Sequence, residues 1–222
     1  MSFPNAAKGI KRIYTAEILK LIGYICLILA AIVGVVALAA PGDEASGAVE
    51  TLSLGGFIGA IVLVVAFAIL MITAFIMNLI GYINARNDNE NFKTALVFLI
   101  VGIVFTGISV FVINNGLSSI LYSLSTLSET LSTIFVIAGV MQIARQLGRE
   151  DISKKGTTVL KLIITTEVIS FILSFISTFL RGGTTEIVST VLLLASLLVT
   201  FIKYIMYLSF LSKSKKMLQV IQ

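Results

Sequence analysis

The hydrophobic positions of this chain gather in six long runs, and short polar segments separate each run from the next. A run of about 18 or more apolar residues can cross a hydrocarbon core of roughly 30 Å as a helix. The pattern therefore predicts an all-α integral membrane protein, a bundle of six transmembrane helices. Their expected ranges are about 17–40, 55–84, 93–113, 118–144, 157–180 and 185–211.

The composition agrees with this interpretation and leaves little chain for a soluble domain. Hydrophobic residues make up 58% of the 222 residues, charged residues only 12%, and the mean hydropathy is +1.07. Soluble domains usually carry about 25% charged residues. We expect a single membrane domain over residues 1–222, with the lipid bilayer as its main partner. The first apolar run is longer than the apolar region of a signal peptide, about 7–15 residues, so we expect an uncleaved first helix.

Lysine and arginine residues lie on alternate connections between the apolar runs. Of the 16 Lys and Arg residues, only Arg181 falls on one side, which leaves 15 on the side of the two termini. Positive charge marks the cytoplasmic side of a membrane protein. The pattern predicts a multi-pass protein of the cell membrane with cytoplasmic N- and C-termini. Short basic clusters of this kind encode topology, so we expect no binding of nucleic acid.

The six runs also group into three helical hairpins, whose first runs contain related stretches. These stretches are "TAEILKLIGYI" from Thr15, "TALVFLIVGI" from Thr94 and "TTEVISFILSF" from Thr165. A hairpin repeated three times is one interpretation. The other is that apolar sequences with basic flanks resemble one another in general.

The fourth run differs from the others because hydroxyl residues alternate with a leucine-rich stripe. The stripe has spacings of three and four, which predicts a packing seam; its members are Leu117, Ile120, Leu124, Leu127, Leu131, Ile134, Ala138 and Met141. Glu129 falls on the opposite side, among serines and threonines. In one interpretation the leucine face packs and the hydroxyls bond their own backbone. In the other, the hydroxyl face lines a wet vestibule that contains Glu129.

A second carboxylate, Glu167, lies inside the fifth run, roughly 12 Å from the start of its apolar stretch at 1.5 Å per residue. An ionised side chain at such a depth costs at least about 2.5 kcal/mol, so it usually faces a partner or a cavity. When the runs fold as a hairpin, Lys203 in the sixth run is about five residues, or roughly 7–8 Å, out of level with Glu167, but the two side chains lean toward one another. We therefore expect a Glu167–Lys203 pair. Glu17 and Lys20, by contrast, begin the first run, where snorkelling explains them.

Small polar residues extend this pair into two stripes at helical spacing. Ser170 and Ser174 share the face of Glu167, and Ser196, Thr200 and Tyr207 share the face of Lys203. One hypothesis is a polar seam that binds a solute or relays ions, with Glu129 as a further candidate residue. The other is a structural ion pair that fixes the register of the hairpin.

The residues for most enzyme chemistry are missing from the chain. Histidine is absent, and the single cysteine, Cys26, cannot form an intrachain disulfide. The sequence also lacks the common nucleophile, metalloprotease and phosphate-loop motifs. We expect no enzyme activity, no cofactor and no metal site.

Two classes of function stay open at this point. The first is a small transport subunit, or a subunit that binds a solute or ion at the polar seam. The second is a non-transporting scaffold, assembly or immunity subunit whose helices serve partner contacts. In size and topology the chain is similar to the substrate-binding subunits of energy-coupling-factor vitamin transporters, a resemblance of outline that rests on no motif. Because the chain is short for a self-contained transporter, we expect a homo-oligomer or a partner membrane subunit.

Overall fold

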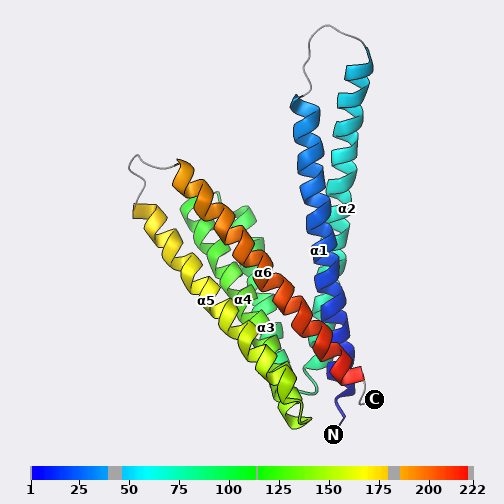
Figure 1. Ribbon diagram of the computed structural model, residues 1–222, viewed down its shortest axis with the longest axis vertical. Helices are drawn as coiled ribbons and strands as arrows, with labels where there is room; N and C mark the ends of the chain where they lie inside the picture. The colour runs from blue at the N-terminus through cyan, green and yellow to red at the C-terminus, as the bar shows by residue number, and fades with distance from the viewer. Residues whose placement is uncertain (1, 40–46, 114, 180–185, 220–222) are drawn as a thin grey trace. The chain divides into compact units, whose positions relative to one another are not determined.

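The chain forms six α-helices in the computed structural model, and the described residues contain no strand (Figure 1). The structure describes residues 2–39, 47–113, 115–179 and 186–219, with side chains except those of 37–54, 115 and 171–197. The helices are α1 (Pro4–Ala39), α2 (Gly47–Ala85), α3 (Glu90–Phe111), α4 (Asn115–Gln146), α5 (Glu150–Phe179) and α6 (Glu186–Gln219). They form two compact units, residues 12–80 and residues 1–11 with 81–222.

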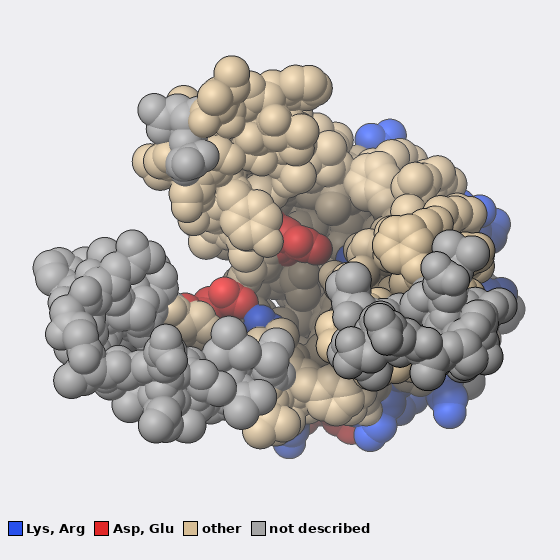
Figure 2. All heavy atoms as spheres, turned by 90° about the horizontal axis from the view of Figure 1, so that it is seen from above, with Lys and Arg blue, Asp and Glu red and all other residues tan. Residues whose placement is uncertain are grey.

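Four of the helices are long and apolar enough to cross a membrane over the described residues. These segments are Pro4–Val36, Gly55–Ala85, Glu90–Phe111 and Gly116–Gln146. Many of their large apolar side chains are exposed, as at Val36, Val62 and Phe111, and uncharged side chains make up most of the described face in Figure 2. Because apolar surface is unfavourable in water, this surface is compatible with a membrane protein.

The unit of residues 12–80 is a hairpin of α1 and α2 that packs through small residues. A side chain at Gly23 of α1 would meet Phe67, Leu70 and Met71 of α2. The rings of Tyr24 and Phe67 lie 6.2 Å apart nearby. Small residues let two helix backbones approach closely, which is a common way to associate helices in membranes.

The other unit contains α3 to α6, and its helix ends follow from local sequence. Asn89 caps α3 by accepting a hydrogen bond from the Asn91 backbone N–H at 2.9 Å. At the end of α4, Gly148 adopts a φ of +68°, which a glycine tolerates without strain. The Arg149 N–H then bonds the Ala144 carbonyl at 2.8 Å, so the helix ends in a Schellman motif. A short turn therefore leads directly into α5.

The first turns of α1 belong to this same unit, and the prediction that the first helix begins near residue 17 is wrong. The helix begins at Pro4, because the fully buried Ala6 and Ile10 lie four residues apart on one helical face. Asp88 fixes this segment by accepting hydrogen bonds from Asn5 Nδ2 at 2.9 Å and from the Ala6 N–H at 2.7 Å. A carboxylate at a helix N-terminus satisfies free backbone donors and complements the helix dipole.

The fully buried side chains of this unit lie toward the starts of α3 and α5 and toward the ends of α4 and α6. Its fully buried side chains include Phe92, Val136, Val140, Ile152 and Phe210. The turn between α4 and α5, with Arg145 and Arg149, lies at the same end. The basic clusters of the sequence and the tight core therefore coincide, while Phe111 and Ile113 at the other end of α3 are more than four-fifths exposed.

Candidate functional site

Glu167 of α5 and Lys203 of α6 form an ion pair, as the sequence predicted. The Lys203 Nζ donates a hydrogen bond to Glu167 Oε1 at 2.7 Å. The two helices form an antiparallel hairpin (Figure 1). Side chains on an α-helix lean toward its N-terminus. This direction brings the carboxylate and the ammonium group together although they are 36 residues apart in the chain.

The Glu167–Lys203 ion pair is only partly buried. The Glu167 side chain is 37% exposed and that of Lys203 is 23% exposed. Its neighbours along α5, Ile164, Val168 and Ile169, are exposed apolar residues. An ion pair among apolar side chains is therefore accessible from one side, where a further polar group could approach it.

The remaining predicted seam residues take different positions. Ser170 and Thr200 are exposed, whereas Tyr207, one turn beyond Lys203, is buried with 6% exposure. The side chains of Ser174 and Ser196 lie outside the described residues. Of the eight candidate residues, the structure joins Glu167 and Lys203 by a direct bond, and the extension of the seam along both helices stays a prediction.

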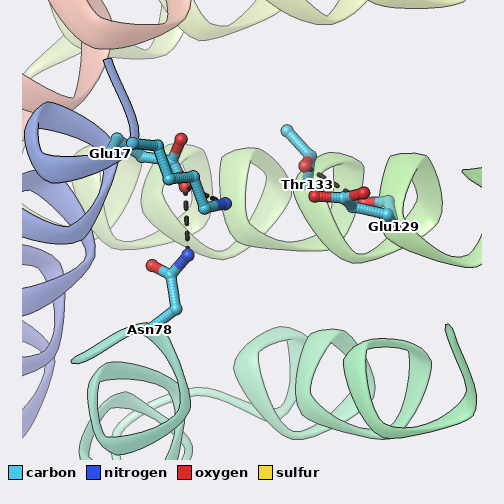
Figure 3. Close-up of polar contacts among 5 residues, drawn as sticks. Glu17, Asn78, Glu129 and Thr133 are labelled. Atoms are coloured by element: carbon cyan, nitrogen blue, oxygen red, sulfur yellow. Dashed lines mark hydrogen bonds and ion pairs between the residues drawn. The ribbon is translucent and has the colours of Figure 1, made fainter. Parts of the chain in front are cut away.

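Glu129 is exposed on α4, and Thr133 one turn later donates its hydroxyl to the Glu129 carbonyl at 3.1 Å (Figure 3). The predicted leucine seam of this helix is wrong in its outer half. Leu117, Ile120 and Leu127 are half or more exposed, while Ser128 and Ser132 on the other side are buried. The serine face of α4, and not its leucine face, is the one that packs.

The serine face packs against α3, where small residues and hydroxyls fit together. Ser132 Oγ donates to the Ala95 carbonyl and Ser125 Oγ to the Gly102 carbonyl, both at 2.8 Å. A side chain at Gly102 would meet Ser125 and Ser128, so the two backbones lie close together. Such contacts suit a bilayer, since they satisfy hydroxyl groups without water. The hypothesis of a wet vestibule is therefore wrong for these two serines.

A third polar cluster, which was not predicted from the sequence, lies in the α1–α2 hairpin (Figure 3). Glu17 Oε1 accepts hydrogen bonds from Lys20 Nζ at 2.9 Å and from Asn78 Nδ2 at 3.1 Å. The Glu17 side chain is 7% exposed and that of Lys20 19%. Snorkelling to the membrane surface is therefore the wrong explanation of these two residues.

Asn78 completes this cluster, but its side-chain oxygen is left without a hydrogen bond among the described residues. The residue is 2% exposed, and its Oδ1 is buried without a hydrogen-bond partner. An unpaired buried acceptor costs about 1–3 kcal/mol. The bond from Nδ2 to Glu17 fixes the orientation of the amide, because the opposite orientation would place its oxygen against the carboxylate. The recurrence of Glu two residues after Thr in "TAE" and "TTE" relates Glu17 to Glu167, but no local pattern indicates the bond from Asn78.

No set of three His, Cys, Asp or Glu side chains in the described part of the chain is arranged to hold a metal ion. A comparison of the chain with protein-family models, curated proteins and solved structures finds no match. The outline shared with vitamin transporter subunits therefore remains a resemblance of size and topology. The function has to be inferred from the geometry of the polar clusters.

Proposed function

We propose that this chain crosses the cell membrane six times, with both termini in the cytoplasm. The lengths of the last two helices support this topology, since α5 has 30 residues and α6 has 34. At 1.5 Å per residue α5 is about 45 Å long and α6 about 51 Å, more than the hydrocarbon core requires. An even number of crossings returns the chain to one side, and in this topology 15 of the 16 Lys and Arg residues fall on the side of the two termini.

We further propose that the protein is a small transport subunit, or a subunit that binds a solute or ion, and that it is not an enzyme. The observation that carries this proposal is the half-exposed Glu167–Lys203 pair in an apolar helical hairpin. A charged pair in a membrane segment is expensive and usually marks a substrate or ion pathway. A pair with a purely structural role has no need of an open side.

The geometry suggests how such a pair would act. An anionic group of a solute can compete with Glu167 for the Lys203 ammonium group, and a cation or proton can compete with Lys203 for the carboxylate. Each exchange breaks the 2.7 Å bond and frees one charge of the pair. Because that charge then needs a new partner in an apolar environment, ligand binding is coupled to the contact between α5 and α6. At this chain length, we expect a homo-oligomer or a partner subunit to complete the pathway.

Cysteine accessibility tests whether the open side of the pair is wet. In a Cys26→Ser background, Ser170→Cys places a thiol one turn beyond Glu167, and Val168→Cys places one on a different face of α5. Both positions are exposed. In proteoliposomes, a charged, membrane-impermeant thiol reagent should modify Ser170→Cys and spare Val168→Cys. If neither thiol reacts from either side of the membrane, the pair is dry and the transport proposal is wrong.

A ligand screen then identifies what binds. The purified protein is heated with inorganic cations, carboxylates and amines in turn, and its melting temperature is recorded for each. A ligand of this site should raise the melting temperature of the wild type but not that of Glu167→Gln or Lys203→Gln. Glu150→Gln, which changes an exposed carboxylate at the start of α5, is the matched control.

One observation favours the second class, a non-transporting interaction or assembly subunit. The serines of α4 pack against α3 instead of lining a vestibule, so part of the polar content of this chain serves packing alone. In that case Glu167 and Lys203 fix the register of α5 and α6. A dry pair in the accessibility experiment would favour this alternative.

A further inference from the structure

Three polar side chains meet where α5 and α6 approach the end that holds the chain termini. Lys155 of α5 donates a hydrogen bond from Nζ to Ser209 Oγ of α6 at 2.6 Å. Lys213 lies four residues after Ser209 and therefore on the same face of α6, and its positive charge acts on the Lys155 ammonium group. Two ammonium groups and one hydroxyl are thus brought together.

The hydrogen-bond donors in this group exceed the acceptors. An ammonium group has three donors and no acceptor, so Ser209 must accept from Lys155 and must direct its own hydrogen elsewhere. Ser209 and Lys213 are exposed, and Lys155 is half-buried. Donors from two helices therefore face an open position.

The nearest acidic side chains do not neutralise these lysines. Asp151 forms two bonds with Arg149, at 3.0 and 3.1 Å, and Glu150 lies 3.9 Å from Lys154. In the part of the chain that the structure describes, neither Lys155 nor Lys213 forms an ion pair. Burial lowers the pKa of Lys155, and the positive charge of Lys213 lowers it further. An anion placed between the two lysines would favour their charged forms and so oppose both effects on this pKa.

We propose that Lys155, Ser209 and Lys213 form a binding site for a phosphate oxyanion, supplied by an acidic phospholipid headgroup or by free phosphate. Charge-assisted bonds from two ammonium groups and a hydroxyl match the several acceptor oxygens of a phosphate. The site lies where the apolar part of α6 gives way to the run of lysines at its end, which is the level of headgroups. It goes beyond the proposed function, since it involves neither Glu167 nor Lys203.

The lipid source is tested with the purified protein in nanodiscs of phosphatidylcholine with or without phosphatidylglycerol. Native mass spectrometry after release from the nanodisc counts the phosphatidylglycerol molecules that stay bound. Each of the variants Lys155→Gln and Lys213→Gln should retain about fivefold less phosphatidylglycerol than the wild type, the effect expected of one lysine at an anionic surface. Phosphatidylcholine binding should not change.

Binding of free phosphate is tested in neutral detergent by adding inorganic phosphate, with chloride at equal ionic strength as the reference. A specific site should raise the melting temperature of the wild type in phosphate, and Lys155→Gln and Lys213→Gln should lose this rise. Lys154→Gln is the matched control for both experiments, because it removes the same charge from the neighbouring residue, whose ammonium faces Glu150.

Dependence on Lys155 and Lys213 in either experiment supports the site and identifies its source. The proposal is overturned if Lys154→Gln reduces binding as much as the two test variants, since binding would then reflect net charge. It is also overturned if neither phosphatidylglycerol nor phosphate distinguishes the test variants from the wild type. Size-exclusion chromatography of every variant excludes misfolding as the cause of a loss.

Discussion

Glu17 and Glu167 are both carboxylates in apolar helices, and both are the third residue of a short Thr-x-Glu stretch. Their surroundings nevertheless differ. The Glu17 side chain is 7% exposed and accepts bonds from two donors, whereas that of Glu167 is 37% exposed and bonds one lysine. The Glu17 cluster is therefore buried, whereas the Glu167–Lys203 pair is partly exposed.

The difference follows from the partner on the neighbouring helix. Asn78 has a short side chain, so its bond to Glu17 requires α1 and α2 to lie close together, and the fully buried Ala16 and Ala74 permit this. Lys203 has a long side chain, so its bond to Glu167 does not require α5 and α6 to lie equally close together. A short partner therefore produces a closed cluster, and a long partner leaves space for another molecule.

The sharpest test of this comparison makes the same change at both sites. Glu17→Ala leaves the half-buried Lys20 ammonium group and the buried Asn78 amide without their shared acceptor, and breaking a buried pair costs about 3–5 kcal/mol. Glu167→Ala should cost about 1 kcal/mol, because solvent screens a partly exposed pair. Unfolding in mixed micelles titrated with SDS, followed by circular dichroism, measures both losses. Equal losses at the two sites would remove the distinction between a closed and an open cluster.

The stability lost at an uncharged helix contact can be compared with the losses at Glu17 and Glu167. A side chain at Gly9 would place its Cβ 2.5 Å from the Gly81 carbonyl oxygen and 2.7 Å from the Ala85 Cβ. Gly9→Ala should therefore destabilise the protein by about 1–3 kcal/mol through overpacking. Gly107→Ala is the control, because nothing lies within 4 Å of its added Cβ. In the same SDS titration this control should be neutral or slightly stabilising, owing to the higher helix propensity of alanine.

A double-mutant cycle measures the coupling across the open pair. Glu167→Ala and Lys203→Ala each leave the opposite charge without its partner, so the double variant should be more stable than the sum of the two losses implies. We expect a coupling free energy of about 0.5–1 kcal/mol for this half-exposed pair. Strictly additive losses in the SDS titration would show that the 2.7 Å bond contributes nothing to stability.

The smallest effect is expected at Lys155. Its pKa is lowered in the folded protein, first by burial and then by Lys213, so the protonated lysine opposes folding. This opposition is fully present below the folded-state pKa and disappears as the pH rises through the unfolded value, 10.5. In detergent without phosphate, Lys155→Met should stabilise the protein by less than about 0.5 kcal/mol at pH 7. The gain should vanish in melts near pH 11, and a destabilised variant at pH 7 would contradict the assigned sign.

The sequence by itself determined the helical class of the protein, the approximate position of its apolar helices and the Glu167–Lys203 pair. These features depend on local periodicity and on the fixed rise and side-chain direction of a helix, which hold for any α-helix. Only the tertiary structure decided which face of α4 is buried. The leucine stripe was the natural choice for a helix in water, where apolar burial drives packing. In an apolar environment, close backbone contact and interhelical hydrogen bonds select the small serine face instead.

The same reason explains the cluster that the sequence did not reveal. Glu17 and Asn78 lie 61 residues apart, and nothing in either local pattern says that they bond. Their contact depends on the register of α1 against α2, which small residues along both helices set. Local sequence decides where a helix forms and which residues share its face. Whether a carboxylate on that face is buried or exposed depends on how closely a second helix approaches it.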